Sequence, residues 1–386
     1  MSFILGTYAR RNISFKEGKG CYLVSDNGEK YLDFVQGIAV NALGHCHEHL
    51  VKTIKEQSSR LWHVSNVFVI PEQEKLAKKL TENTFADFVC FQNSGSEATE
   101  AGIKIARKYF HAIGKPEKNR IVTFEGAFHG RTLAALFAAN NPKHTEGFAP
   151  TVEGFDQVPF ADEEALKKKI NKNTAAIMVE TIMGEGGVKV LPDSFLKKLR
   201  KICDENELLL ILDEVQCGVG RTGNFFAFES SGISPDIVPI AKGIGGGFPL
   251  GACLVSKKAS IGMTPGTHGS TFGGNPLACS VGNAVLDIVL EKDFLKQVKE
   301  KSKYFYDGLI NLKKNYPKII SEVRGVGFML GLKLLIDNNK FLEKLMNNKM
   351  LAVKASENVI RLLPPLTVEK KEIDEALNKL AKTCKE

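Results

Sequence analysis

Two residues far apart in the sequence, Asp213 and Lys242, are the first candidates for chemistry. Residues 208–212 form a continuous apolar run that is too short for a globular helix, which predicts a strand buried on both faces of a parallel sheet. Asp213 follows this run directly. Because ligands bind at the carboxyl ends of strands in open α/β sheets, this carboxylate is a candidate for chemistry before it is a candidate for structure.

An apolar strand that ends in Asp213 and Glu214 has two chemical interpretations. One is the metal-binding acid of a P-loop enzyme, which requires an earlier loop of the form G-x-x-x-x-G-K-[ST]. Neither residues 18–20 nor residues 114–116 fit that loop. The other is a carboxylate that faces the ring nitrogen of pyridoxal phosphate, while a lysine forms a Schiff base with the aldehyde. This second interpretation requires an isolated lysine on a tight loop nearby, and Lys242 stands in a glycine-rich stretch.

Residues 94–96, Ser-Gly-Ser, precede a predicted helix that runs from residue 97 to residue 111. A helix N-terminus with small residues offers free amide groups and the positive end of the helix dipole, which together can hold a phosphate. The alternative is an ordinary N-cap with a capping acid at Glu97. Alone, the capping interpretation would be the better one, but the acid and the lysine described above favour a phosphate site.

A loop after the predicted strand at 121–124 carries Phe128, His129 and Arg131. An aromatic side chain here can cover one face of a pyridine ring while Val215 covers the other, which excludes water and fixes the ring plane. Arg131 offers a planar fork that matches a carboxylate. We interpret His129 as a histidine that packs the loop rather than as a catalytic residue.

Six motifs resemble the class III (subgroup II) aminotransferases, occur in that family's order and cover nearly the whole chain. Each motif alone would be a weak signal, but six in register are a strong one. Residues 37–45 most resemble the family members that act on acetylornithine in arginine synthesis. The six motifs are residues 93–98, 127–132, 184–187, 213–216, 241–243 and 269–276.

The resemblance implies that the cofactor is pyridoxal 5'-phosphate (PLP) and that Lys242 and Asp213 are the catalytic residues. Lys242 would hold the aldehyde, and burial would keep its amine free of a proton when it moves one to or from the substrate. Asp213 would favour a protonated ring nitrogen, which makes the ring an electron sink. Gln216 would donate to the ring hydroxyl. The expected cofactor-binding residues are Ser94, Gly95, Ser96, Phe128, Asp213, Val215, Gln216, Lys242 and Thr271.

The family also implies how two different substrates are bound. Arg361 lies in an apolar run, where an unpaired charge is costly, so it requires a carboxylate partner from the substrate or from Glu185. By similarity, Arg361 binds the α-carboxylate of glutamate and is masked by Glu185 when an ω-amine is bound. Residues 268–271 match a loop that reaches the neighbouring subunit's cofactor, which implies a homodimer with shared active sites. The expected substrate-binding residues are Arg131, Glu185, Ser270 and Arg361.

The implied reaction moves the ω-amino group of N2-acetyl-L-ornithine to 2-oxoglutarate by a two-stage ping-pong transfer. Its products would be N-acetyl-L-glutamate 5-semialdehyde and L-glutamate. Three alternatives stay open: another ω-aminotransferase acting on succinyldiaminopimelate, succinylornithine, ornithine or 4-aminobutyrate, a glutamate semialdehyde aminomutase, or a non-catalytic binding relative. Intact Lys242 and Asp213 disfavour the last. One departure from the family is Thr181, where proline is common.

The expected fold class is α/β, in the form of the fold type I PLP-dependent transferases. Strands alternate with helices through residue 255, which predicts a parallel sheet with right-handed crossovers. An Asn-Gly turn near residue 27 predicts a hairpin. The large domain would have a mostly parallel central sheet flanked by helices, and a smaller α+β domain would come from both chain ends. We expect the large PLP-binding domain at 59–285 and the two parts of the small domain at 1–58 and 286–386.

Composition sets the remaining expectations. The 386 residues carry a formal net charge of +8, but the lysines are spread over helix-like segments, which favours solvated helix faces over a nucleic-acid surface. The eight cysteines are scattered without a C-x-x-C pair, which is typical of free thiols in a reducing compartment. No signal sequence or membrane-length apolar stretch is present, so we expect a cytoplasmic enzyme without a membrane or nucleic-acid partner.

Residues 45–49, His-Cys-His-Glu-His, have the composition of a metal site. Side chains spaced two apart converge on one ion only along a strand, whereas the residues that follow have helical periodicity. We therefore interpret this cluster as polar turn and cap residues and expect no metal.

Overall fold

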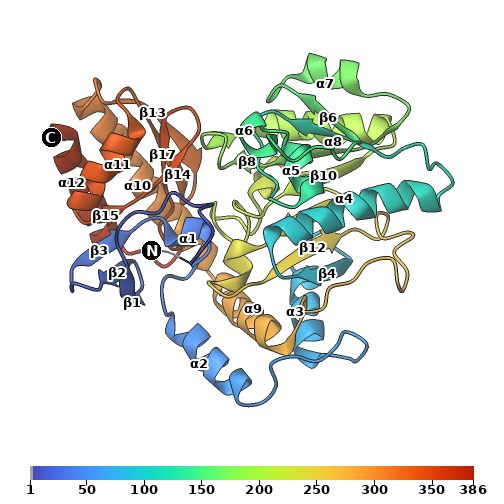
Figure 1. Cartoon of the computed structure of the whole chain (residues 1–386), viewed down its shortest axis with the longest axis horizontal. Coiled ribbons are helices and arrows are strands. Elements are labelled where there is room, and N and C mark those ends of the chain that lie inside the picture. The colour runs from blue at the N-terminus through green and yellow to red at the C-terminus, as the bar shows by residue number, and fades with distance from the viewer. Residues whose placement is uncertain (1–2) are drawn as a thin grey trace.

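The computed structural model describes residues 3–386 and contains a central seven-stranded sheet flanked by helices (Figure 1). Neighbouring strands pair in parallel at β10 with β11 and β7, and at β5 with β7 and β6. This confirms the expected mostly parallel sheet. In order across the sheet, the strands are β4 (Phe88–Gln92), β12 (Gly251–Val255), β11 (Ile237–Ile240), β10 (Leu209–Asp213), β7 (Thr174–Glu180), β5 (Arg120–Phe124) and β6 (Phe155–Val158).

Strand β12 runs antiparallel to both of its neighbours, β11 and β4. The alternation of strands and helices through residue 255 predicted a parallel sheet, and β12 is the exception that leaves the sheet mostly parallel. The reason is the length of the connection: a parallel crossover needs about a dozen residues or more, and residues 241–250 are too few. This short return loop is the one that carries Lys242.

Strand β10 is buried on both faces, as its apolar run predicts. Leu209 and Ile211 pack in one cluster with residues of α4 (Gly95–Ala112). Leu210 and Leu212 point to the other face and pack with residues of α8 (Asp193–Glu205). Alternate residues along a strand face opposite sides, so helices on both sides of the sheet fix the position of Asp213 at the strand's end.

In the described part of the chain, three smaller sheets accompany the central one, and the smallest of them is the pair of β8 (Ile182–Met183) and β9 (Lys189–Val190). The first has the order β1 (Phe15–Lys19), β2 (Tyr22–Ser25), β3 (Lys30–Asp33) and β15 (Met350–Leu351), so N-terminal and C-terminal segments pair in one sheet. Figure 1 shows the blue strands β2 and β3 beside the orange-red elements of the C-terminal part. The hairpin of β2 and β3 confirms the predicted Asn-Gly turn. The domain boundaries after residues 58 and 285 stay a prediction.

The second small sheet and its helices complete the C-terminal part. The sheet has the order β13 (Ile320–Val326), β14 (Met329–Leu334), β17 (Val359–Leu362) and β16 (Val353–Ala355), and the helices are α10 (Phe294–Asn315), α11 (Asn338–Asn347) and α12 (Lys370–Lys385). The remaining elements are α1 (Gln36–Ala39), α2 (Glu48–Ser58), α3 (Pro71–Glu82), α5 (Leu133–Ala139), α6 (Pro142–Thr145), α7 (Glu163–Lys169), β8 (Ile182–Met183), β9 (Lys189–Val190), α9 (Pro276–Val289) and the 3₁₀ helices η1 (Ala227–Ser231) and η2 (Lys242–Gly245).

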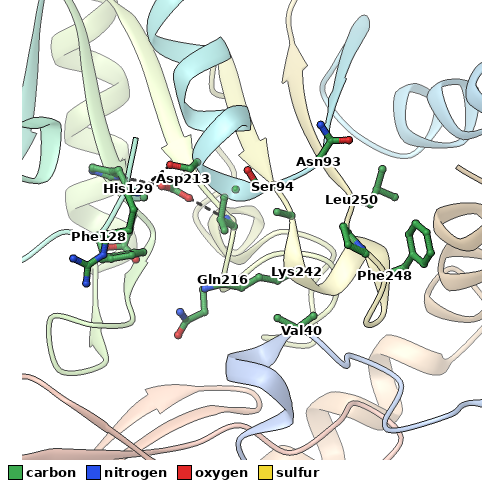
Figure 2. Close-up of a pocket in the computed structure, with 18 of the residues that line it drawn as sticks. Val40, Asn93, Ser94, Phe128, His129, Asp213, Gln216, Lys242, Phe248 and Leu250 are labelled. Atoms are coloured by element: carbon green, nitrogen blue, oxygen red, sulfur yellow. Dashed lines mark hydrogen bonds and ion pairs between the residues drawn. The ribbon is translucent and has the colours of Figure 1, made fainter. Parts of the chain in front are cut away.

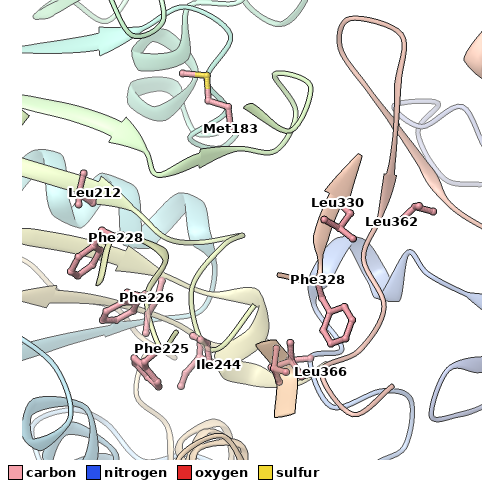
Figure 3. Packing of buried hydrophobic residues seen from close by; sticks show 14 of the residues in the cluster. Met183, Leu212, Phe225, Phe226, Phe228, Ile244, Phe328, Leu330, Leu362 and Leu366 are labelled. Carbon is pink, nitrogen blue, oxygen red and sulfur yellow. The ribbon is translucent and has the colours of Figure 1, made fainter. Parts of the chain in front are cut away.

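One apolar cluster connects the C-terminal part to the central sheet (Figure 3). Leu212 and Phe226 belong to it from the central region, and Phe328 and Leu362 belong to it from the C-terminal sheet. All four are buried. Close packing of this kind resists displacement, so it holds β17, the strand of Arg361, in a fixed relation to β10. Within residues 3–386, no helix is long and apolar enough to span a bilayer.

Candidate active site

A cavity of about 410 Å³ opens at the carboxyl ends of β10 and β11. Figure 2 shows Asp213, Lys242, Gln216 and Ser94 around it. Nine of the thirteen predicted site residues line this cavity, whereas Glu185, Ser270, Thr271 and Arg361 do not. The nine are Ser94, Gly95, Ser96, Phe128, Arg131, Asp213, Val215, Gln216 and Lys242.

Lys242 is the first residue of η2, directly after the short segment that leaves β11. Its backbone has a φ of 47°, a left-handed conformation that residues other than glycine rarely adopt. Burial, and after it the charge of Arg361, lowers the pKa of its amine to about 8, against the opposing effect of nearby carboxylates. A buried lysine of this kind is a stronger candidate for covalent and proton-transfer chemistry than a solvated one.

Asp213 is held at both of its carboxylate oxygens. One oxygen, Oδ1, accepts from the Val215 amide at 3.0 Å, and the other, Oδ2, lies 2.8 Å from His129 Nδ1. Both side chains are buried. Burial alone would lower the pKa of His129, but the hydrogen bond and charge of Asp213 outweigh it, so the pKa is raised and the protonated form is favoured.

This contact corrects the interpretation of His129 as a loop-packing residue, because its ring bonds directly to the central acid. Sequence reasoning also gave no role to Glu180, which is buried at the end of β7 and in register with Asp213. Glu180 accepts from the Phe128 amide at 2.8 Å and so fixes the aromatic loop. Burial and the charge of Asp213 raise the pKa of Glu180 to about 7. The sequence did contain a signal for this arrangement, because Glu180 and Asp213 both follow apolar runs. Neighbouring parallel strands end at the same edge of a sheet, which places two such acids close together.

The first turn of α4 forms another wall of the cavity. Ser94 caps the helix by accepting from the Glu97 amide at 3.2 Å. The amides of Gly95 and Ser96 have no acceptor within the helix, so they are available to an anion. Glycine is required at position 95, because a Cβ there would lie 2.6 Å from Val215 Cγ1. The N-cap and the phosphate-site interpretations therefore describe the same turn.

The Ser96 hydroxyl has a different set of contacts from the one expected. It accepts from the amides of Arg131 at 3.0 Å and Thr132 at 3.1 Å. It therefore ties the start of α4 to the loop that carries Phe128, while its own amide stays available. Gly130 lies against it, where a Cβ would meet the hydroxyl oxygen at 2.1 Å.

Arg361 and Glu185 form a pair immediately outside the cavity lining. Arg361 is 1% exposed, and its Nη2 donates to Glu185 Oε1 at 2.6 Å. This confirms that the buried guanidinium has a carboxylate partner. Its Nη1 donates to Gln216 Oε1 at 3.1 Å, which connects the pair to a side chain that lines the cavity. The amide nitrogen of Gln216 is then the group left to act as a donor toward a ligand.

Ser270 and Thr271 do not line the cavity of their own chain. The Ser270 hydroxyl accepts from Asn93 Nδ2 at 3.2 Å and from the Gly273 amide at 2.9 Å. Thr271 is exposed. Within one chain, the structure therefore does not bring these two residues to Lys242.

Thr181, the departure from the family pattern, makes a specific contact. Its hydroxyl donates to Glu214 Oε1 at 2.7 Å, and both residues are buried. The amides of Ala227 and Phe228 also donate to this carboxylate, at 3.0 Å and 3.2 Å. Threonine thus supplies a donor that proline could not provide, next to the residue that follows Asp213.

Two of the three histidines of residues 45–49 have separate carboxylate partners. His45 Nε2 lies 2.7 Å from Asp33, whereas His49 Nε2 lies 3.2 Å from Asp287. His47 is the N-cap residue of α2. In the part of the chain that the structure describes, no group of three or more histidine, cysteine or acidic side chains is arranged to hold a metal.

The donor set of the cavity fits a planar ring that carries a phosphate and an aldehyde. Unpaired helix amides at Gly95 and Ser96 suit the phosphate, and a buried carboxylate at Asp213 suits a ring nitrogen. Lys242, with its lowered pKa, suits the aldehyde. The same groups have no evident use in metal or P-loop chemistry.

Comparison with known proteins gives an independent result. The model of the family described as aminotransferase class III matches residues 7–384. The acetylornithine aminotransferase of Agrobacterium fabrum is 55% identical over 374 residues, which are 97% of this chain and 94% of that protein. The acetylornithine aminotransferase of Brucella melitensis is also 55% identical, over 96% of this chain and 92% of that protein.

Solved structures agree with these relatives. The N-acetylornithine aminotransferase of Stenotrophomonas maltophilia has a TM-score of 0.85 and 35% identity, covering 97% of this chain and 96% of that one. The ornithine aminotransferase of Toxoplasma gondii has a TM-score of 0.95 and 30% identity, covering 99% of this chain and 92% of that one. The Toxoplasma enzyme has also been crystallised with partial occupancy of PLP at its active site.

Proposed function

Because this chain belongs to the class III aminotransferases, we propose that it transfers the ω-amino group of N2-acetyl-L-ornithine to 2-oxoglutarate. The products are N-acetyl-L-glutamate 5-semialdehyde and L-glutamate, a step of arginine synthesis. The observation that carries the proposal is the pair of the buried Arg361 and the partly exposed Glu185, 2.6 Å apart beside the cavity of Lys242. A carboxylate-binding arginine that can be masked suits an enzyme whose two amino donors react at different ends.

The protein is a PLP-dependent aminotransferase. When bound, PLP supplies an electron sink and carries the amino group between the two substrates. We assign the phosphate to the amides of residues 94–96 and the ring nitrogen to Asp213. Phe128 and Val215 line the cavity as the two covers of the ring, and Gln216 donates to the ring hydroxyl.

Lys242 is the residue that moves protons at the substrate carbon. Its pKa of about 8, well below the ordinary 10.5 of a lysine, leaves far more of the amine unprotonated near neutral pH than in a solvated lysine, as a general base requires. Asp213 holds the proton on the ring nitrogen, and His129 keeps the carboxylate correctly oriented through the 2.8 Å contact. Glu180 holds the loop of Phe128 in place and so helps to exclude water.

Substrate discrimination is assigned to three charged side chains. Arg131 lines the cavity and binds the carboxylate remote from the reacting amine. Arg361 binds the α-carboxylate of glutamate after Glu185 moves away from it. With acetylornithine bound, Glu185 stays on Arg361, and the guanidinium presents no free positive charge to the ω-amine.

We assign the protein to a homodimer in which Thr271 acts in the partner's site. Residues 61–69 and 270–273 form two segments that both expose large apolar side chains. The segments contact each other, since Asn66 donates to the carbonyls of Ser270 and Gly273. An exposed apolar surface of this kind favours association. Its exposed members are Leu61, Trp62, Val67, Phe68, Val69 and Phe272.

A subunit-mixing experiment tests the shared site. Lys242→Ala removes the lysine of a site, and Thr271→Glu places a negative charge against the partner's cofactor phosphate. Each variant alone should be inactive. A mixed dimer restores one complete site, so mixing should recover activity, whereas no recovery in dimers shown to have exchanged subunits would contradict the shared site.

The cysteines support a reducing compartment, the cytoplasm. All eight are free thiols, and most are buried. The basic test of the activity itself is product analysis: purified protein with PLP, N-acetylornithine and 2-oxoglutarate should form glutamate and the semialdehyde in equal amounts. Failure with this pair, combined with turnover of ornithine or 4-aminobutyrate, would assign another ω-aminotransferase.

A further inference from the structure

Helix α1 (Gln36–Ala39) is a left-handed turn beside the active site. Its φ angles are positive throughout: 49° at Gln36, 64° at Ile38 and 63° at Ala39, with glycine at the remaining position. The amides of Ile38 and Ala39 both donate to the Val35 carbonyl. Residues that carry a Cβ avoid this conformation, and β-branched residues such as Ile38 avoid it most. Surrounding contacts must therefore impose the turn.

Asp33 provides the central contact that imposes this conformation. Its carboxylate accepts from the Val35 amide at 2.8 Å and from the Gln36 amide at 3.2 Å. The same carboxylate lies 2.7 Å from His45 Nε2. The Gln36 side chain donates back to the Asp33 carbonyl at 2.9 Å. Asp33 and Gln36 are buried, so these bonds are shielded from water.

The turn lies between the two parts of the site that handle the substrate. Val40, the residue after it, lines the cavity, and Figure 2 shows it beside Lys242, on the side away from Ser94. Ala39 packs in one cluster with Val359 and Leu363, which flank Arg361. A change in the turn would therefore move the wall of the cavity between the reactive lysine and the switching arginine.

We propose that Asp33 is a positioning residue for amino-donor recognition: by holding Gln36–Ala39 left-handed, it keeps Val40 at the cavity wall that the donor's carbon chain contacts. The inference rests on the proposed function for the identity of the donor. Asp33 itself touches neither the cofactor site nor the cavity. Its effect is exerted through the turn alone.

The first variant is Asp33→Asn, which keeps the size of the side chain but removes the charge that the amides and His45 share. The loss of charge-assisted hydrogen bonds predicts a rise of about tenfold in the KM for N-acetylornithine. The kcat and the affinity for PLP should change by less than about threefold, because the cofactor residues keep their contacts. The matched control is Asp156→Asn, another buried aspartate, paired with Arg120 at 2.7 Å on edge strand β6.

A second variant separates the turn from general destabilisation. Ala39→Gly removes one methyl group and makes the left-handed conformation acceptable, so alone it should leave the KM within about twofold. In the double variant Asp33→Asn with Ala39→Gly, the KM should return at least halfway, on a logarithmic scale, to that of the wild type. Hydrogen exchange of the Ile38 and Val40 amides should rise in Asp33→Asn and fall again in the double variant.

Two results would overturn the proposal: an unchanged KM in a folded Asp33→Asn protein, or a raised KM that Ala39→Gly does not restore. If Asp33→Asn prevents folding, His45→Leu carries the same comparison, because it removes one partner of the carboxylate. Turnover of N-acetylornithine by the wild-type protein shows separately whether the proposed function itself fails. If the wild type does not use N-acetylornithine, the same variants are compared with the ω-amino donor that it does use.

Discussion

His129 and Asp213 form a buried pair in which Nδ1 and Oδ2 are 2.8 Å apart. They come from the ends of strands that are not neighbours, because β7 lies between β5 and β10. The pair gives the central acid a second hydrogen-bonded oxygen and fixes the orientation of its carboxylate. The acid's function therefore depends on a residue that lies 84 positions away in the sequence.

Replacing His129 with Gln should lower kcat without preventing PLP binding. Hydrogen bonds to charged groups contribute about 1.5–3 kcal/mol, so the expected loss in kcat is about 10- to 100-fold. The matched control is His144→Gln, since His144 packs edge-on against Phe128 and has no bond to Asp213. Equal effects of the two variants on kcat would remove His129 from the site.

The raised pKa of His129 also predicts a pH dependence of stability. A histidine with a folded-state pKa above its unfolded value of 6.5 stabilises the protein fully below about pH 6.5. That contribution is lost as the pH rises through the folded-state pKa. Urea unfolding of the PLP-free protein should therefore show the wild type's advantage over His129→Phe shrinking with increasing pH, and an advantage that grows with pH would contradict the pairing.

In PLP-free protein, the reactivity of Lys242 should titrate near pH 8. Burial and the charge of Arg361 both lower its pKa from 10.5 to about 8. The rate of capture of a simple aromatic aldehyde should rise with a midpoint near this value. Arg361→Met should move the midpoint upward, because it removes a neighbouring positive charge. A midpoint that stays near 10.5 in the wild type would show that the amine is solvated.

Glu185→Gln should impair the acetylornithine half-reaction more than the glutamate half-reaction. Without the carboxylate, Arg361 keeps a free charge that disfavours the acetylornithine pose, while glutamate still finds its α-carboxylate partner. A difference of about tenfold between the two losses is expected from one charge-assisted bond. Glu357→Gln, which alters a more distant ion pair with Arg324 and Lys189, serves as the control. Equal losses in both half-reactions would exclude the switch.

Thr181→Val should destabilise the fold with little change in substrate preference. The buried Glu214 carboxylate would lose the donor at 2.7 Å, which costs about 1–3 kcal/mol. The matched control is Thr123→Val: this buried threonine on β5 has a hydroxyl without a hydrogen-bond partner, so its replacement should be neutral or stabilising. Similar unfolding free energies for the two variants would show that the contact with Glu214 contributes nothing.

Local sequence patterns predicted the parts of the site that lie on single elements. The apolar run before Asp213, the small residues before α4 and the glycine-rich loop of Lys242 all have the expected structure. Each depends on the period of a strand, the cap of a helix or a tight turn, and these are local properties. The same holds for the hairpin of β2 and β3.

Contacts between elements could not be read from those patterns. Pairing of His129 with Asp213 depends on the order of strands in the sheet, which periodicity does not specify. The left-handed turn at Gln36–Ala39 runs against the backbone preference of Ile38 and Ala39. It depends on hydrogen bonds to the Asp33 carboxylate, which is in turn fixed by its contact with His45, and periodicity specifies neither. Glu180 was overlooked for the same reason, since its role depends on a loop that follows a different strand.

The most direct test of the central claim is a pair of single-turnover measurements on the PLP-loaded protein without 2-oxoglutarate. One sample receives N-acetylornithine and the other free ornithine, and loss of the cofactor's visible absorption band is followed with time. Our account predicts rapid conversion with N-acetylornithine and much slower conversion with ornithine. Faster conversion with ornithine would contradict the proposed substrate, and no conversion with either would contradict the assignment of an ω-aminotransferase of this type.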